Sequence, residues 1–444
     1  MTLLGPLFAP QEIRAAFSDR ACLQGMLDFE AALARAEAAT GVIPNEAAPA
    51  IARLCKAELI DAEALAKAAP NGGNLAIPLV KQLTALVARA DAEAARFVHW
   101  GATSQDAIDT GLVLQLKAAL PLLEVDLNRL SEALAALAKK HKHTVQVGRT
   151  WLQQALPVTF GLKAAGWLDG VERQRVRLDE IKTRLFVVQF GGAAGTLAAI
   201  GPKGLDVAQA LAEELKLGLP ALPWHGQRDR FAEAATLFGL IIGGCAKMAR
   251  DVSLMMQTEI GETLEPAGEG RGGSSTMPHK RNPVACASVL AAGARAPGLV
   301  ATMLGAMAPE HERGLGGWQA EWVALPELAI LAGGAVRTMA ETMEGLEVNP
   351  ARMAENLGRT QGLIMAEAVQ MALGARIGRQ QAHQLIEKAS KKAVADNLPL
   401  REALAVDPDV TKHLQPAEID RLLDPQHYLG QAGAMVERVL TARK

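Results

Sequence analysis

Apolar residues recur at helical spacing along almost the whole chain, and this pattern predicts an all-α protein. The first clear segment covers residues 18–41, which opens on the capping candidates Ser18 and Asp19 and closes on Gly41. Shorter amphipathic segments follow to about Pro70, where the break PNGGNLAIP (70–78) separates them from the next helix. The pattern shows no alternation of strand, turn and helix, which argues against dinucleotide-binding and phosphate-loop folds.

The middle of the chain predicts five long helices. Residues 122–147 contain no Gly or Pro, and further long helical runs occupy about 153–190, 227–262, 284–307 and 316–342. Arg295 is the one charged residue of segment 284–308, which is otherwise apolar on every face. A helix of this kind has to be surrounded by protein, in a large core or between copies of the chain. We therefore expect a homo-oligomer.

After Asn349 the predicted helices become shorter and charged residues become frequent again. We expect an N-terminal helical domain at 1–102, a central long-helix bundle that mediates oligomerisation at 103–348, and a small C-terminal helical domain at 349–444.

Composition narrows the class of protein further. Hydrophobic residues make up 50% of the chain but aromatic residues only 4%, which suits closely packed helices. Lys and Arg (46) nearly balance Asp and Glu (48), so no basic surface for nucleic acid is expected. Four cysteines lie far apart without metal-ligand spacing and are expected to be reduced core residues. The N-terminus lacks a basic leader, and no apolar run is expected to reach the ~18 residues of a membrane span. The expectation is a soluble, cytoplasmic protein without a metal site.

The stretch GEGRGGSSTMPHKRNPV (268–284) is the most unusual polar segment. Asn282 is a favoured N-cap and Pro283 a favoured first helical residue, so a helix is predicted to start near Val284. Free N–H groups at that helix start would attract an anion, with positive charge added by Lys280, Arg281 or Arg271. The glycines would let the loop close over a ligand. An ordinary capped turn between helices is the alternative.

Three further polar clusters are candidates for carboxylate binding. In HWGATSQDAID (99–109), Thr103 and Asp106 have capping-box spacing, which places the hydroxyls of Thr103 and Ser104 at a helix start. In VGRTWLQQALPVTFG (147–161), Arg149 and Gln153 lie at the predicted junction of two long helices. Arg149 either pairs with an acid of the protein or holds a substrate carboxylate. The third cluster, PEHERGLGGWQAEW (309–322), contains Arg313. Helix capping, surface ion pairs and core packing remain alternative explanations for all three.

Taken in order, GATSQD, GRTWLQQALP, GGSSTMPHKRNP and ENLGRTQGLIMAE resemble the fumarase/aspartase superfamily, and the resemblance covers nearly the whole chain. It implies an all-α fold of three domains. It also implies a homotetramer whose central bundles together form a core of about twenty helices. Active sites in this superfamily combine loops from different subunits and use no cofactor. The expected partners are therefore a small-molecule substrate and further copies of the chain.

Within the superfamily the chain is most similar to the lactone-forming cycloisomerases of protocatechuate degradation, in the β-ketoadipate pathway. These intramolecular lyases close a tricarboxylate diene to a lactone. The similarity includes FSDRACLQGMLDFEAALARAEA, GNLAIPLVKQL and FGGAAGTLA. Adenylosuccinate and argininosuccinate lyases carry His where this chain has Trp151, and Trp cannot exchange a proton. A carboxylate leaving group has a pKa of ~4, so it can depart without receiving a proton.

The resemblance also implies roles for individual residues. Ser274 is expected to transfer the proton, with Lys280 and Asn282 stabilising the charge that develops, and with Ser275, His99 and His279 as rival candidates. The residues expected to bind or shape the substrate are Thr103, Ser104, Arg149, Trp151, Gln153, Arg313 and Arg359. Two other functions stay open: another lyase of the superfamily acting on an adduct such as adenylosuccinate or argininosuccinate, and a catalytically inactive structural protein with this fold.

Overall fold

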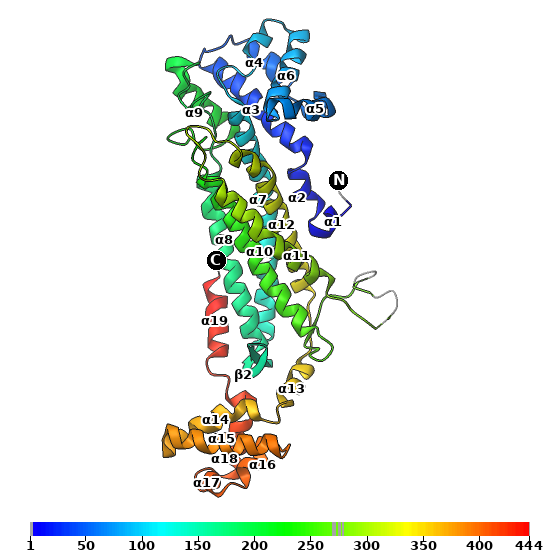
Figure 1. Ribbon diagram of the computed structural model, residues 1–444, viewed down its shortest axis with the longest axis vertical. Coiled ribbons are helices and arrows are strands. Elements are labelled where there is room, and N and C mark those ends of the chain that lie inside the picture. The colour runs from blue at the N-terminus through cyan, green and yellow to red at the C-terminus, as the bar shows by residue number, and fades with distance from the viewer. Residues whose placement is uncertain (1–2, 269–271, 274–276, 278, 444) are drawn as a thin grey trace. The chain divides into compact units, whose positions relative to one another are not determined.

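The computed structural model describes residues 3–268, 272–273, 277 and 279–443, and these residues fold almost entirely into helices (Figure 1). The described part holds nineteen α-helices, five short 3₁₀ helices and two antiparallel pairs of strands. The all-α class expected from the apolar spacing is therefore confirmed.

Five long helices lie where the sequence predicted long helices. They are α7 (Ser104–Lys140), α8 (Phe160–Leu185), α10 (Asp229–Met255), α11 (Val284–Gly305) and α12 (Gly317–Glu344). The ends of α11 and α12 agree with the prediction to within two residues. Helix α7 begins well before the predicted residue 122 and continues through Pro121, because the buried side chains along it outweigh the loss of one backbone hydrogen bond.

The contacts of the chain gather into two compact units, and each of the five long helices contributes residues to both. Unit 1 comprises Met1–Asn128, Arg173–Ala246 and Ser288–Thr338, and unit 2 comprises Arg129–Glu172, Lys247–Ala287 and Met339–Lys444. The remaining elements of unit 1 are α1 (Gly5–Phe8), α2 (Gln11–Ala16), α3 (Asp19–Ala39), α4 (Ala47–Ala52), η1 (Ala57–Leu59), α5 (Ala62–Gly72), α6 (Ala76–Ala90), η2 (Ala94–Phe97), η3 (Gly201–Lys203) and α9 (Gly204–Leu215). The three-domain division at residues 102 and 348 stays a prediction.

Unit 2 contains all four strands and the shorter C-terminal helices. Its elements are β1 (Val145–Thr150), β2 (Gln153–Thr159), β3 (Thr263–Leu264), β4 (Glu347–Val348), α13 (Pro350–Gly358), η4 (Leu363–Met365), α14 (Ala366–Ile377), α15 (Arg379–Ala395), α16 (Leu400–Ala405), α17 (Pro408–Thr411), α18 (Pro416–Leu423), η5 (Pro425–His427) and α19 (Ala432–Ala442). Helices α14, α15, α16 and α18, orange in Figure 1, lie together around a buried cluster that includes Val369, Leu373, Ile386 and Leu400.

Helix α3 shows how local signals set an element. The Ser18 hydroxyl accepts a hydrogen bond from the Ala21 N–H at 3.3 Å, so Ser18 is the N-cap that the sequence predicted. The helix ends at Ala39, and Gly41 follows with φ +67°, a backbone angle that favours glycine. Its buried face, including Phe29 and Leu33, packs against α4 and α9.

Residues 145–159 form a β-hairpin, although the sequence pattern predicted parts of two long helices there. Strand β1 pairs antiparallel with β2, and the register shifts at Gly148, where a Cβ would lie 2.6 Å from the Leu156 carbonyl oxygen. Trp151 and Leu152 form the two-residue turn between the paired residues Thr150 and Gln153. The helix prediction was wrong because Gly148 and Pro157 disfavour a helix in this segment, and its β-branched residues favour a strand.

Among the residues that the structure describes, three helices are long and apolar enough to cross a membrane by length and composition alone, so the expectation that no segment reaches that threshold was wrong. The most apolar stretches of α10 and α12 are 56% and 67% buried, whereas that of α11 is only 28% buried. Most of α10 and α12 therefore belongs to the core of the chain. Most residues in the apolar stretch of α11 are not buried by their own chain, as expected from segment 284–308.

Candidate active site

Three residues predicted to bind a carboxylate, Thr103, Ser104 and Arg313, lie together in unit 1. Arg313 Nη1 donates to the Thr103 hydroxyl at 2.7 Å, and Nη2 lies 3.4 Å from the Ser104 hydroxyl. In the described part of the chain, no carboxylate lies within ion-pair distance of Arg313. A guanidinium beside two hydroxyl groups, without an acid of its own, is suited to receive a carboxylate ligand.

Asp106 holds the start of α7 in place. One of its carboxylate oxygens accepts from the Thr103 N–H at 2.9 Å, as the capping-box spacing predicted. The same carboxylate accepts from the backbone N–H groups of Gly191 and Gly192 at 3.0 Å and lies 2.6 Å from His225 Nε2. Because Asp106 is fully buried, these contacts fix Thr103 and Ser104 against a second segment of the chain.

His99 forms a pair with a buried carboxylate. Its Nδ1 lies 2.6 Å from Glu30 Oε1, and its backbone adopts a φ of +59°. Burial alone would lower the pKa of His99, but the charge and hydrogen bond of Glu30 outweigh it and raise the pKa above its usual range. A raised pKa favours the protonated form of His99, which is suited to bind an anion or donate a proton. The catalytic role of His99 stays a prediction.

Arg149 pairs with an acid of the protein. Its Nη1 and Nη2 donate to the two oxygens of Glu262 at 2.9 and 2.7 Å. Glu262 is fully buried and also accepts from Gln146 Nε2 and Asn356 Nδ2, both at 2.8 Å. Burial by itself raises the pKa of Glu262, but these hydrogen bonds and the charge of Arg149 lower it overall. Of the two alternatives for Arg149, pairing with an acid of the protein is thus the one observed. A contact of Arg149 with substrate stays a prediction.

The other predicted residues of unit 2 are exposed. Trp151 is 98% exposed at the tip of the hairpin, and Gln153 beside it is exposed as well. Arg359 follows the end of α13 and is also exposed. Within the described chain, therefore, no pocket encloses these three side chains.

The Gly-rich loop is described only in part, and Ser274 and Ser275 lie outside the described residues. His279 and Lys280 are exposed, and Asn282 is half-buried. The Asn282 N–H donates to the Gly272 carbonyl at 2.8 Å, and α11 begins at Val284 as predicted.

The start of α11 is already capped by an acid of the chain. The N–H groups of Ala285 and Cys286 donate to the carboxylate of Glu265 at 3.1 and 2.8 Å. Arg281 is paired with Glu347 at 2.7 Å. The prediction that these N–H groups are free to bind a ligand was therefore wrong, because Glu265 occupies the anion-binding end of the helix.

Sequence reasoning missed Glu30, Gln105, Glu262 and Glu265, which hold or adjoin the predicted residues. Glu262 and Glu265 stand three residues apart between a long helix and the Gly-rich loop. Gln105 and Asp109 share one face of a helix at i, i+4 spacing. These spacings were visible signals, but the partners lie far away in the sequence.

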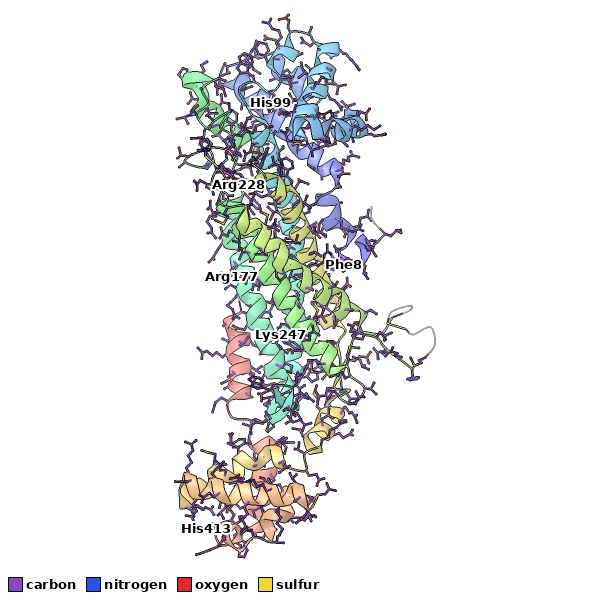
Figure 2. All side chains as sticks on the ribbon, in the orientation of Figure 1. Phe8, His99, Arg177, Arg228, Lys247 and His413 are labelled. Carbon is purple, nitrogen blue, oxygen red and sulfur yellow. The ribbon has the colours of Figure 1, made fainter. Side chains whose placement is uncertain are left out.

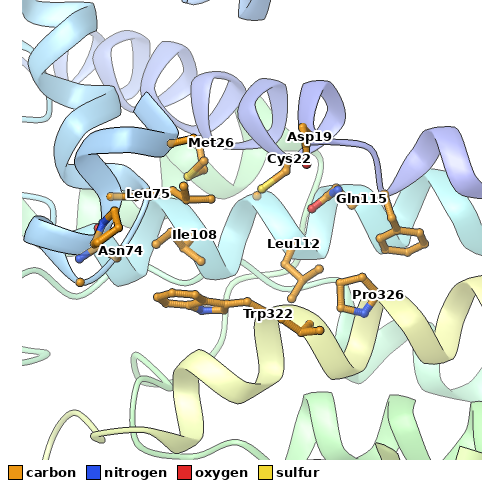
Figure 3. Close-up of a pocket in the computed structure, with 17 residues that line it drawn as sticks. Asp19, Cys22, Met26, Asn74, Leu75, Ile108, Leu112, Gln115, Trp322 and Pro326 are labelled. Carbon is orange, nitrogen blue, oxygen red and sulfur yellow. The ribbon is translucent and has the colours of Figure 1, made fainter. Parts of the chain in front are cut away.

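A cavity of about 600 Å³ lies elsewhere in unit 1 (Figure 3). Its lining is mostly apolar and includes Met26, Leu75, Ile108, Leu112 and Trp322. Asp19 is the one charged residue of the lining, and none of the residues predicted to bind substrate belongs to it. An apolar cavity with a single acid is poorly suited to a substrate with several carboxylates.

The described residues contain neither an exposed low-pKa cysteine nor a group of metal ligands. Cys55, Cys245 and Cys286 are buried free thiols, and Cys22 is half-buried. Burial raises the pKa of Cys22 to about 11 and that of Cys245 to about 12. Among the residues that the structure describes, no three His, Cys, Asp or Glu side chains gather as metal ligands.

Comparisons with known proteins give the family. The family model described as lyase matches residues 9–298, and the model described as adenylosuccinate lyase C-terminus matches residues 362–439. The 3-carboxy-cis,cis-muconate cycloisomerase of Pseudomonas aeruginosa is 58% identical over 99% of this chain and 95% of that protein. The same enzyme of Bradyrhizobium diazoefficiens is 57% identical over 99% of this chain and 97% of that protein.

A solved structure agrees with these relatives. The structure of 3-carboxy-cis,cis-muconate lactonizing enzyme from Pseudomonas putida superposes with a TM-score of 0.93 at 53% identity. The superposition covers 99% of this chain and 98% of that chain.

Proposed function

This chain belongs to the fumarase/aspartase superfamily of lyases, and from that premise we propose that it interconverts 3-carboxy-cis,cis-muconate and 4-carboxymuconolactone. The observation that carries the proposal is full-length identity of 57–58% to two enzymes named for this reaction. The cluster of Arg313, Thr103 and Ser104 supports it, because it offers a cation and two hydroxyls to a substrate with three carboxylates. We place the reaction in protocatechuate degradation in the cytoplasm.

In the lactonising direction, one substrate carboxylate adds across a double bond while a proton is delivered to the carbon beside another carboxylate. We assign that proton to Ser274, by its position in the superfamily's signature loop. In the reverse direction Ser274 removes the proton, and negative charge accumulates on the neighbouring carboxylate as an enediolate. Electrostatic stabilisation of that charge would be the largest contribution to rate, and we assign it to Lys280 and Asn282.

The remaining carboxylates are assigned to the cluster around Arg313. Arg149 is engaged with Glu262, so we propose that it mainly holds the hairpin in place and that any contact with substrate uses its remaining N–H groups. Trp151 replaces a proton-transferring histidine with an apolar surface that suits a planar diene. Gln153, His279 and Arg359 stay candidate contacts, with Ser275 and His99 as alternative proton donors.

We further propose a homotetramer in which one chain's site is completed by loops of other chains. Two observations support it: most residues in the apolar stretch of α11 are not buried, and Trp151 is almost fully exposed. Apolar surface that one chain leaves accessible in this way is typical of subunit interfaces. Besides its own copies, the proposed binding partner of the chain is a small tricarboxylate substrate. We propose no binding to nucleic acid or to a membrane.

The purified protein should consume 3-carboxymuconate, measured as loss of the ultraviolet absorbance of the conjugated diene. Adenylosuccinate and argininosuccinate, tested in parallel, should not be cleaved at comparable rates. Ser274→Ala should lower kcat by a factor of ~100 or more, while the matched Ser275→Ala variant keeps most of it. Efficient cleavage of either succinyl adduct, or no turnover of the diene, would refute the proposed reaction.

A further inference from the structure

A buried ionic cluster in unit 1 lies close to the group formed by Arg313, Thr103 and Ser104. Its members are Asp109, Arg228 and Glu321, each at most 2% exposed, and Figure 2 labels Arg228 at the start of α10. Arg228 donates to the two oxygens of Asp109 at 2.7 and 3.1 Å, and to Glu321 at 2.5 to 3.2 Å. All three groups are removed from water, so their partners inside the protein decide their charge and position.

The cluster contains two acids but one base. Burial raises the pKa of Glu321 even though Arg228 opposes the shift. Burial by itself would lower the pKa of Arg228, but the charges and hydrogen bonds of Asp109 and Glu321 outweigh it and raise that pKa. The cation that adjoins the cluster is Arg313.

Asp109 is linked to Arg313 by two separate bridges. In the first, Gln105 Nε2 donates to Asp109 Oδ2 at 3.2 Å, while Gln105 Oε1 accepts from Arg313 Nε at 3.2 Å. In the second, Trp318 Nε1 donates to Asp109 Oδ1 at 2.9 Å, and the Trp318 ring lies 6.0 Å from Arg313 Cζ. Gln105 Nε2 also donates to the His225 carbonyl at 3.1 Å. Asp109 is therefore the carboxylate that contacts both Gln105 and Trp318, the two side chains next to the guanidinium besides Thr103 and Ser104.

We propose that Asp109 is a positioning residue that acts through Gln105 and Trp318 to hold Arg313 in the orientation that receives a substrate carboxylate. The amide of Gln105 cannot rotate without breaking a bond at each end. The indole of Trp318 is held on the other side of Asp109 and presents its ring to the guanidinium. Arg313 thus meets its ligand already ordered, which lowers the entropy cost of binding. The inference rests on the proposed role of Arg313 in substrate binding.

Trp318→Phe tests the second bridge, because it keeps an aromatic ring and removes the N–H that reaches Asp109. Trp322→Phe is the matched control. Trp322 lies edge-on to Trp318 with ring centroids 4.7 Å apart, and its Nε1 has no hydrogen-bond partner among the described residues. We expect Trp318→Phe to raise KM about tenfold with kcat little changed, and Trp322→Phe to leave KM unchanged. Gln105→Met provides the same test for the first bridge.

A double-mutant cycle that combines Trp318→Phe with Arg313→Ala distinguishes a positioning role of Trp318 from simple stabilisation of the fold. If Trp318 acts through Arg313, adding Trp318→Phe to Arg313→Ala should raise KM no further. Additive effects on KM, or equal KM values for Trp318→Phe and Trp322→Phe, would overturn the inference. A lowered melting temperature with unchanged KM in both Trp318→Phe and Gln105→Met would also overturn it, because it would show a purely structural role.

The dissociation constant of tricarballylate, measured by calorimetry, gives a second readout that does not depend on turnover. The Trp318→Phe and Gln105→Met variants should bind this tricarboxylate about tenfold more weakly than wild type, again with no further loss in the Arg313→Ala background. If wild type binds tricarballylate with this pattern but does not turn over the muconate, the proposed reaction fails while the positioning role holds. If turnover is normal and all variants bind equally, the positioning role alone fails.

Discussion

Glu37 on α3 is a fully buried acid whose carboxyl oxygens have no hydrogen-bond partner among the described residues. Burial, and then the nearby charge of Glu30, raise its pKa to about 9. The folded chain therefore keeps a proton that the unfolded chain releases near pH 4.5. A raised carboxyl pKa means that stability is greatest below the unfolded value and is lost as the pH rises toward about 9.

Glu37→Gln should remove this loss, because an amide of the same shape does not titrate. The variant should gain little relative to wild type near pH 4.5 and on the order of 1–3 kcal/mol in unfolding free energy near pH 8. Urea unfolding at a series of pH values measures the difference. Glu46→Gln, at an exposed position of the same unit, serves as the control and should run parallel to wild type. A Glu37→Gln curve parallel to wild type would contradict a protonated Glu37.

The tip of the β1–β2 hairpin carries residues that are unusual for a turn of its backbone conformation. Trp151 and Leu152 both have positive φ angles, 53° and 63°, and both side chains are exposed. Left-handed backbone angles cost a residue with a Cβ roughly 1–2 kcal/mol, and turns of this kind usually carry Asn-Gly. A strained turn that also exposes an indole supports the proposed role of Trp151 in contacting substrate or a partner chain.

Replacing the tip by Asn-Gly, as Trp151→Asn with Leu152→Gly, should relieve the strain but remove the indole. We expect kcat/KM for the muconate to fall at least about tenfold while the unfolding free energy of the chain does not decrease. Leu152→Gly alone is the matched control, since it relaxes the turn and keeps Trp151, and it should retain most of the activity. Full activity in the Asn-Gly variant would show that Trp151 is dispensable.

At the scale of the whole molecule, the mostly unburied apolar stretch of α11 predicts an assembly of several chains. Light scattering should give four times the chain mass of 46.8 kDa. If sites are shared, mixing Ser274→Ala and Trp151→Ala proteins, each with reduced activity, under conditions of subunit exchange should raise the activity above that of either variant, because some sites then receive both intact residues. Each variant mixed with itself is the control. A monomer mass, or no restoration when mass spectrometry proves exchange, would refute shared sites.

Local signals in the sequence determined much of this protein. The helical class, the Ser18 cap of α3, the capping box of Thr103 and Asp106, and the start of α11 at Val284 were all predicted. Each depends on residues within a few positions of one another, where periodicity and capping preferences act directly. The motifs that point to the superfamily are likewise short and continuous.

Contacts between distant residues were decided only by the tertiary structure. The hairpin at 145–159 depends on pairing between two strands, which the spacing of apolar residues along the chain did not reveal. Arg149 meets Glu262 from 113 positions away, and Arg313 meets Thr103 from 210 positions away. Glu265 occupies the helix start that the sequence left open for a ligand. Charge partners are chosen by proximity in space and by burial, and neither quantity is contained in a local pattern of residues.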